Sequence, residues 1–335
     1  MKGMLERGST KPEVYQQLAS VYQIKRDPRQ AEQTLLTGIE KNPQSVPLHL
    51  SLARLYSQTN ELEKADAAYQ KLIELDKENA LKYRTALANL YWAKDDKDKA
   101  QAILNDIVTK EPGKAENWLM VSRFYVAKKD LDQAQRFLKD GLSHNQKSFE
   151  LRLALSELYL NTEKADDALA LLQETLKLKK DPGDPDILRT KNALAKVHLL
   201  RNEVDQAQTY VNEVLKEAPR NLDANFASGN INLLQGKGEK AVAAFRSIVG
   251  DNPEFIPAQL RLAEAHLMNG EMELANETLK SALSANPQNR DLLRAAARVA
   301  MLRKDLPEAE KYLQTILEEH PDDFEVRAAL GDIYV

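Results

Sequence analysis

The chain has 335 residues, of which 43% are hydrophobic and 29% are charged. This composition is typical of a folded protein with a core to bury, and it argues against intrinsic disorder. The 47 basic and 51 acidic residues give a formal net charge of -4 and are mixed along the chain, so no basic stripe is available to bind phosphates. We therefore expect no nucleic-acid partner.

The sequence also lacks cysteine and long apolar runs. Without cysteine there are no disulfides, thiolate nucleophiles or cysteine-ligated zinc, and the compartment is left open between the cytoplasm and a bacterial periplasm. Residues 1–8 carry no apolar core of a secretory signal, and no apolar run approaches the roughly 20 residues that span a bilayer. We expect no membrane insertion by this chain.

A short pattern recurs from one end of the chain to the other. The core Leu-Ala-x-x-Tyr occurs at 18–22, 52–56 and 87–91, with steps of 34 and 35 residues. Variants of this core begin at Val121, Leu155, Leu194, Ser228, Leu262, Ala296 and Leu330, with steps of 34 residues except for one of 39. Such a period is typical of a solenoid whose repeats pack on their neighbours.

Each repeat carries further residues at fixed distances from the core. Twelve residues after the small second residue of the core there is always an alanine, at Ala31, Ala65, Ala100, Ala134, Ala168, Ala207, Ala241, Ala275 and Ala309. A large apolar residue follows each alanine, and proline closes six of the nine repeats. Small residues allow two helices to approach closely, and proline ends the second helix because it lacks an amide donor.

Within each repeat the apolar residues are spaced three and four apart, as in Val14, Leu18 and Val21, which predicts helices and no strands. Second helices are expected to fill the stretches between the first helices. The first helices are predicted at 12–25, 47–58, 80–93, 115–128, 149–161, 186–201, 222–235, 256–269 and 290–303.

These spacings resemble the tetratricopeptide repeat, whose signature of Trp-x-x-Leu-Gly-x-x-Tyr is followed by Ala, Phe and Pro at the same distances. The resemblance covers essentially the whole chain. It implies an all-α fold, a right-handed superhelix of antiparallel helix pairs, and a protein that binds other proteins without being an enzyme.

The repeats divide the chain into segments. Residues 12–180 form repeats one to five, 181–187 an inserted loop, and 188–323 repeats six to nine. The loop is either a tolerated surface insertion or a hinge or partner-contacting edge. Residues 1–11 are expected to be the end of a preceding repeat or an N-terminal cap, and 324–335 the first helix of a truncated tenth repeat. Both ends suggest a fragment of a longer array; terminal capping helices are the alternative.

The resemblance also implies where a partner binds. In this family the first helices line the concave groove, through residues six and three before the small core residue and one and four after it. From the third repeat on, the residue four after it is apolar throughout, which favours an extended or helical peptide with apolar anchors; packing on the neighbouring repeat is the alternative. The predicted groove residues are Leu50, Arg54, Asn89, Trp92, Leu119, Arg123, Val126, Leu153, Leu160, Asn192, Lys196, Phe226, Asn230, Leu260 and Arg298.

Two finer points concern the charges and the aromatic anchor. Trp92 is the sharpest single candidate, because aromatic anchors dominate many interfaces. The polar cluster of Arg189, Asn192, Lys196 and Asn230 would suit an acidic segment, although a solvated face explains it equally well. No repeat has lysine three residues before the small core residue, so the carboxylate clamp of chaperone-binding relatives is not expected.

Motifs for chemistry are missing. The five histidines have no partner at metal-ligand spacing, so His198 and His266 are expected to be packed or hydrogen-bonded. The glycines at 236 and 238 lack the spacing of a phosphate loop and indicate a turn. We expect no catalytic, metal or cofactor site.

The leading hypothesis is therefore a non-catalytic interaction scaffold. By analogy with similar bacterial arrays, envelope assembly, secretion or exopolysaccharide export are its candidate settings. The alternatives are the repeat region of a larger enzyme, such as a glycosyltransferase, and self-association through the exposed C-terminal helix around Leu330 and Tyr334.

Overall fold

The computed structural model describes residues 10–334, and this range folds into nineteen helices joined by turns, without strands. The all-α prediction is confirmed. Residues 1–9 and 335 lie outside the described residues, and most of the predicted N-terminal segment 1–11 falls there. The first helices of the repeats are α2 (Pro12–Ile24), α4 (Val46–Gln58), α6 (Ala80–Ala93), α8 (Ala115–Ala127), α10 (Phe149–Asn161), α12 (Pro185–Leu200), α14 (Leu222–Leu234), α16 (Ile256–Met268), α18 (Arg290–Leu302) and α20 (Phe324–Tyr334).

Second helices alternate with them along the chain, and the first helices from α2 to α18 begin and end within one residue of their predicted bounds. The second helices are α3 (Pro28–Lys41), α5 (Leu62–Leu75), α7 (Lys97–Lys110), α9 (Leu131–His144), α11 (Ala165–Leu176), α13 (Val204–Glu217), α15 (Gly238–Asp251), α17 (Met272–Ala285) and α19 (Leu306–Glu319).

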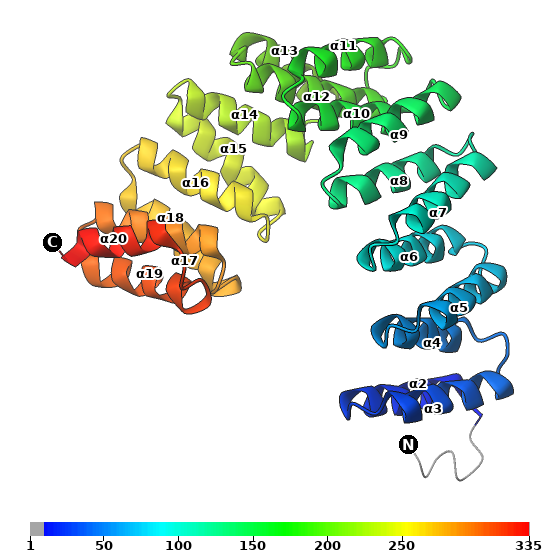
Figure 1. The fold of residues 1–335 in the computed structure, drawn as a ribbon. Helices are drawn as coiled ribbons and strands as arrows, with labels where there is room; N and C mark the ends of the chain where they lie inside the picture. Colours follow the sequence, from blue (N-terminus) through cyan, green and yellow to red (C-terminus); the bar gives the residue numbers. More distant parts are fainter. Residues whose placement is uncertain (1–9, 335) are drawn as a thin grey trace. The chain divides into compact units, whose positions relative to one another are not determined.

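The chain consists of two compact units, residues 1–158 and 159–335, and the division falls inside α10. In the first unit α2 packs on α3, α4 on α5, α6 on α7 and α8 on α9. In the second unit α12 packs on α13, α14 on α15, α16 on α17 and α18 on α19. Figure 1 shows these pairs as antiparallel hairpins, each contacting the next pair along its unit.

The contact between the two helices of a repeat is built on the predicted alanines. All nine, from Ala31 to Ala309, have no exposed surface. The large apolar residue that follows each alanine is buried as well, as Leu104 and Phe245 illustrate. A methyl group at the closest approach lets the two backbones come together, and the neighbouring large side chains then fill the remaining space.

In the repeat formed by α14 and α15 the two helices approach so closely that the small core residue is a glycine. Gly229 occupies the small core position on α14, and a Cβ atom there would lie 2.5 to 2.9 Å from three ring atoms of Phe245 on α15. The ring of Phe245 is itself fully buried. Only glycine therefore fits opposite this phenylalanine.

The turn between the first and second helices has the same conformation in every repeat. The residue seven positions after the small core residue adopts a left-handed conformation, with φ between 57° and 76°, at Arg26, Asn60, Asp95, Lys129, Glu163, Asn202, Gly236, Gly270 and Lys304. The next N–H donates to a carbonyl five positions earlier; for example, Asp130 donates to Tyr125 at 2.9 Å. This is the Schellman ending, which satisfies the last carbonyls of the first helix.

The predicted inserted loop is divided between two elements. Residues 181–184 lie in the connection after α11, whereas residues 185–187 form the first turn of α12 and Ile187 is buried. The ammonium group of Lys179 bridges the carboxylates of Asp184 and Asp186 at 3.0 and 2.7 Å. The extra residues are therefore ordered by local ion pairs.

The segment predicted as a tenth repeat contributes α20, which packs on α19. Leu330 and Ile333 are partly buried against the core formed by α17, α18 and α19, whereas Tyr334 is exposed. Two of these three apolar side chains of α20 are thus covered from one side.

Replacing Gly229 by alanine is expected to destabilise the fold by about 1–3 kcal/mol, because the new methyl group overlaps the Phe245 ring. Chemical denaturation followed by circular dichroism measures this change. Adding Phe245→Leu to Gly229→Ala should cost less than the sum of the two single changes. Gly250→Ala serves as a control, since no atom lies within 4 Å of a Cβ there. Equal losses at the two glycines would contradict the overlap.

Replacing Lys129 by glycine is expected to raise the free energy of unfolding by about 0.5–1 kcal/mol, because glycine adopts the left-handed conformation without the Cβ penalty. Lys129→Ala keeps the Cβ atom and removes the same exposed side chain, so it should give no gain. The same denaturation measurement compares the two variants. A gain for alanine that matches the gain for glycine would show that the backbone conformation is not its source.

Candidate functional site

We use the term first-helix face for the surface formed by the solvent-facing sides of the first helices within each unit. In the first unit α2 contacts α4 and α6 contacts α8; in the second unit α12, α14, α16 and α18 contact one another in sequence. The position one residue after the small core residue is exposed at Arg54, Asn89, Arg123, Lys196 and Arg298, and half-buried at Asn230.

The apolar candidates are mostly half-buried. This holds for Leu50, Leu119, Leu153, Leu160, Phe226 and Leu260, whereas Val126 is exposed. Phe226 packs edge-on against Phe245 and Phe255, with ring centroids 5.6 and 5.7 Å apart. These residues therefore take part in packing while one side of each faces solvent. The burial pattern is compatible with both packing on the neighbouring repeat and contact with a partner.

Trp92 illustrates the same division. Its half-buried ring stands nearly perpendicular to Phe124 and Tyr125 on α8, with centroids 5.5 and 6.0 Å apart. Lys97 lies 5.8 Å from the centre of the ring. Trp92 thus braces the third repeat against the fourth, and its role as a partner anchor stays a prediction.

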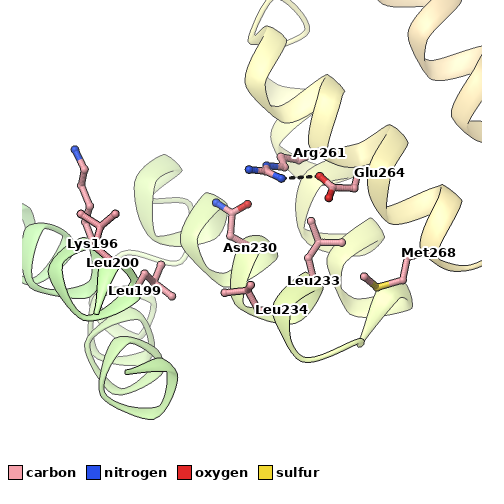
Figure 2. A pocket seen from close by; sticks show the side chains of 9 residues that line it. All are labelled: Lys196, Leu199, Leu200, Asn230, Leu233, Leu234, Arg261, Glu264 and Met268. Atoms are coloured by element: carbon pink, nitrogen blue, oxygen red, sulfur yellow. Dashed lines mark hydrogen bonds and ion pairs between the residues drawn. The ribbon is translucent and has the colours of Figure 1, made fainter. Parts of the chain in front are cut away.

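A hollow of about 340 Å³ lies on the first-helix face of the second unit. Its lining comes from three consecutive first helices, α12, α14 and α16 (Figure 2). The side chains that line it are Lys196, Leu199, Leu200, Asn230, Leu233, Leu234, Arg261, Glu264 and Met268. Among the predicted candidates, the structure brings Lys196 and Asn230 together here.

The lining is divided into two rows. In Figure 2 the polar groups of Lys196, Asn230, Arg261 and Glu264 lie along one side, and the leucines and Met268 lie along the other. The hollow therefore presents an apolar strip beside a polar strip, both running across the three helices.

The sequence-based prediction missed the most exposed apolar part of this lining. Leu200, Leu234 and Met268 are the last residues of their helices and are 64%, 65% and 46% exposed. Leu302, at the same position of α18, is 52% exposed. We call these four residues the apolar row. Their 34-residue recurrence, five positions after the small core residue, is visible in the sequence, but the family positions that we followed end one residue earlier.

The first unit has no such row. Its first helices end at Ile24, Gln58, Ala93 and Ala127, and only the first of these is a large apolar residue. The apolar row is therefore a property of the second unit rather than of the repeat.

The predicted polar cluster is only partly available to a partner. Arg189 lies 3.5 Å from Asp186, and the amide of Asn192 donates to Asn221 at 3.0 Å. Lys196 and Asn230 line the hollow, and Lys196 has no ion-pair partner within residues 10–334. The guanidinium of Arg261 pairs with Glu264 at 2.6 Å inside the hollow.

The two histidines at the tyrosine slot are structural, as predicted. His198 and His266 are buried, and their Nδ1 atoms lie 2.6 and 2.7 Å from the carboxylates of Glu203 and Glu271 in the following turn. These hydrogen bonds hold the pKa of both glutamates below the usual value. The predicted turn at Gly236 is also present, between α14 and α15.

Residues 10–334 contain neither a cluster of metal-ligating side chains nor a helix suited to crossing a membrane. Within this range no three histidine, aspartate or glutamate side chains are grouped so as to hold a metal ion. No helix in the described part of the chain has both the length and the apolar character that a membrane span needs.

Arg294, three residues before the small core residue of α18, is neutralised from the last repeat. Its guanidinium donates to Asp323 at 2.8 Å, and Arg290 donates to the same carboxylate at 2.6 Å. Burial alone would raise the pKa of Asp323, but the N–H of Val326 and the two guanidinium groups hold it below its usual 3.8. This ion pair ties α20 to α18.

Asp323→Asn is expected to lower stability at neutral pH and to matter less in acid. Because the folded-state pKa is depressed, the ion pairs contribute above the unfolded-state pKa and are lost as pH falls through the folded-state value. The difference in unfolding free energy between wild type and Asp323→Asn should therefore shrink from about pH 7 to about pH 3. Urea denaturation across this range measures it. A constant difference would show that the carboxylate charge is not involved.

Comparisons with known proteins bear on the repeats and the fold. Models of the tetratricopeptide repeat match residues 23–90, 91–158, 125–189 and 269–333, and a second model with the same description matches 192–254. No curated protein matches the sequence.

Several solved structures are similar in fold. The APC/C hetero-tetramer Cut9-Hcn1 matches 92% of this chain at 17% identity with a TM-score of 0.57, and this chain spans 59% of the matched one. PilW, a type IV pilus biogenesis factor, matches 64% of this chain and 98% of its own at 21% identity, with a TM-score of 0.56. A tetratricopeptide repeat protein from Parabacteroides merdae matches 76% and 99% at 12% identity, with a TM-score of 0.55. At these identities the likeness concerns the fold alone.

Proposed function

Because the chain belongs to the tetratricopeptide-repeat family, we propose that it is a non-catalytic scaffold that binds a partner protein or peptide on its first-helix face. The fold is one that generally mediates protein–protein interactions. Family membership supports this class of function, and the partner has to be argued from the residues of the face itself.

The observation that carries the proposal is the hollow on α12, α14 and α16 together with the apolar row beside it. Four large apolar side chains recur at the ends of consecutive first helices, each about half exposed or more. Single exposed apolar residues are common on protein surfaces, whereas a contiguous set at a concave site marks an interaction surface. A partner that covers the row would remove this surface from water.

The lining of the hollow also favours binding over catalysis. It contains no histidine, serine, threonine or cysteine, so the lining has no hydroxyl–imidazole or thiol–imidazole pair of nucleophile and base. Its single carboxylate, on Glu264, is exposed and paired with Arg261. The chemistry of these groups is that of recognition, with apolar contacts beside a few polar ones.

The biological setting remains a finer proposal. Envelope assembly, secretion and exopolysaccharide export in bacteria are the settings that we propose, by analogy with similar bacterial repeat arrays. The rival proposal, that the chain is the repeat region of a larger enzyme such as a glycosyltransferase, is tested by sequencing the reading frame beyond Val335. Self-association through α20, which exposes Phe324 and Tyr334, is tested by light scattering at high concentration.

Binding should depend on the first-helix face and not on the second helices. The variant Lys196→Glu/Leu234→Gln/Arg298→Glu changes the face. The control Lys216→Glu/Arg246→Glu/Leu274→Gln makes the same change of charge and removes one exposed leucine on second helices. Proteins captured from a lysate of the source organism by the wild-type chain are identified by mass spectrometry.

The expected outcome is a protein that the wild-type and control chains retain and the face variant loses by about tenfold or more, because apolar burial and charge pairing are removed together. Circular dichroism checks that all three chains are folded. Equal capture by the two triple variants would exclude the first-helix face of the second unit as the binding surface.

A further inference from the structure

We propose that the hollow receives an amphipathic α-helix of the partner, whose apolar stripe lies on the apolar row and whose acidic flank faces Lys196. This inference rests on the proposed function, because it specifies what the first-helix face binds. Three observations support it: the polar strip beside the apolar row, the spacing of the residues along the apolar row, and the basic side chains without a carboxylate partner in the described part of the chain.

The two-row lining fits a helical occupant. The apolar row and the polar strip lie side by side on one wall, and both cross α12, α14 and α16 (Figure 2). An amphipathic helix carries an apolar stripe with polar residues directly beside it, so one helix can satisfy both strips at once. An extended strand sends successive side chains to opposite faces, so it leaves half of them off this wall.

The spacing of the row also matches a helix. Leu200, Leu234 and Met268 stand on consecutive packed helices, whose axes lie roughly 8–10 Å apart in proteins. Residues seven apart on an α-helix are separated by about 10.5 Å and face the same side. A bound helix can therefore place one apolar residue on each member of the row, and Leu302 on α18 extends the row by a further step.

The charges beside the row select an acidic flank. On α12, α16 and α18 the basic residues Arg189, Lys191, Arg261, Arg290 and Arg294 each lie within ion-pair distance of a carboxylate. Within the described residues Lys196 and Arg298 have no such carboxylate, and both occupy the position one residue after the small core residue. A basic or apolar flank would cover these charges without pairing them, whereas an acidic flank pairs them.

Selection from a displayed library of random peptides about 20 residues long, which span about 30 Å as helices, tests the occupant directly against the full chain. The expected winners carry aliphatic residues at i, i+3 or i+4, and i+7, with aspartate or glutamate beside them. Winners that are proline-rich, strictly alternating or basic would overturn the proposal.

A charge exchange then tests the orientation of the winning peptide, measured by fluorescence anisotropy. Leu234→Gln and Met268→Gln should each weaken binding about tenfold, whereas Leu274→Gln on α17, with similar exposure to Met268, should leave it unchanged. Lys196→Glu should weaken binding severalfold, and a peptide with lysine in place of its flanking glutamates should reverse that preference. Equal binding of both peptides to Lys196→Glu would overturn the proposed flank.

The two proposals fail in different ways. Loss of the lysate partner in the face variant, combined with selection of extended or basic peptides, would leave the scaffold proposal standing and remove the helical occupant. Selected peptides that bind the face variant and the wild-type chain equally well would remove both. A proline placed in the middle of the winning peptide should abolish binding, because it breaks the helix.

Discussion

The structure depends on one steric constraint, the closest approach between the two helices of each repeat. Nine alanines with no exposed surface lie at that approach. At Gly229 even a methyl group is excluded, because the ring of Phe245 occupies the space where a Cβ atom would lie. A larger side chain at these positions would push the helices apart and disturb both neighbouring repeats. Since the contact fixes how each first helix is turned about its own axis, it also decides which side chains face solvent.

The turn that follows each first helix adds a second constraint with a functional result. The left-handed residue reverses the chain two positions after the helix ends, so no further turn of helix covers the last helical residue. A polar residue such as Gln58 is readily solvated at this position, whereas Leu234 presents an exposed apolar group to solvent. The apolar row thus has two causes. The left-handed turn, which recurs in the repeats, exposes the last residue of each first helix, and in the second unit α12, α14, α16 and α18 carry a large apolar residue there.

The fold could be predicted from the sequence because its determinants are local and repeated. The alanine spacing and the three-four apolar pattern gave the bounds of the first helices to within one residue. The site was harder, because positions four and five after the small core residue differ by about 100° around the helix axis. That angle separates the buried Leu233 from the solvent side, where Leu234 lies. The packing of Trp92 on Phe124 depends on the next repeat and cannot be derived from one helix pattern. Helix α12 begins at Pro185, one residue before its predicted start, because the side chain of Asp184 accepts a hydrogen bond from the N–H of Asp186 and caps the helix.

In the proposed binding mode, affinity and specificity have separate sources. The apolar row supplies area to be covered, and area of that kind discriminates weakly between partners. Discrimination comes from charge, and the second unit neutralises most of its first-helix cations from within; Asp323, for example, engages both Arg290 and Arg294. On α12, α16 and α18 the cations without a carboxylate partner among the described residues are Lys196 and Arg298, which lie three repeats apart. Because pairing them is favourable only with a partner that carries carboxylates along the same line, two side chains set the sign and the length of the segment that the proposed site accepts.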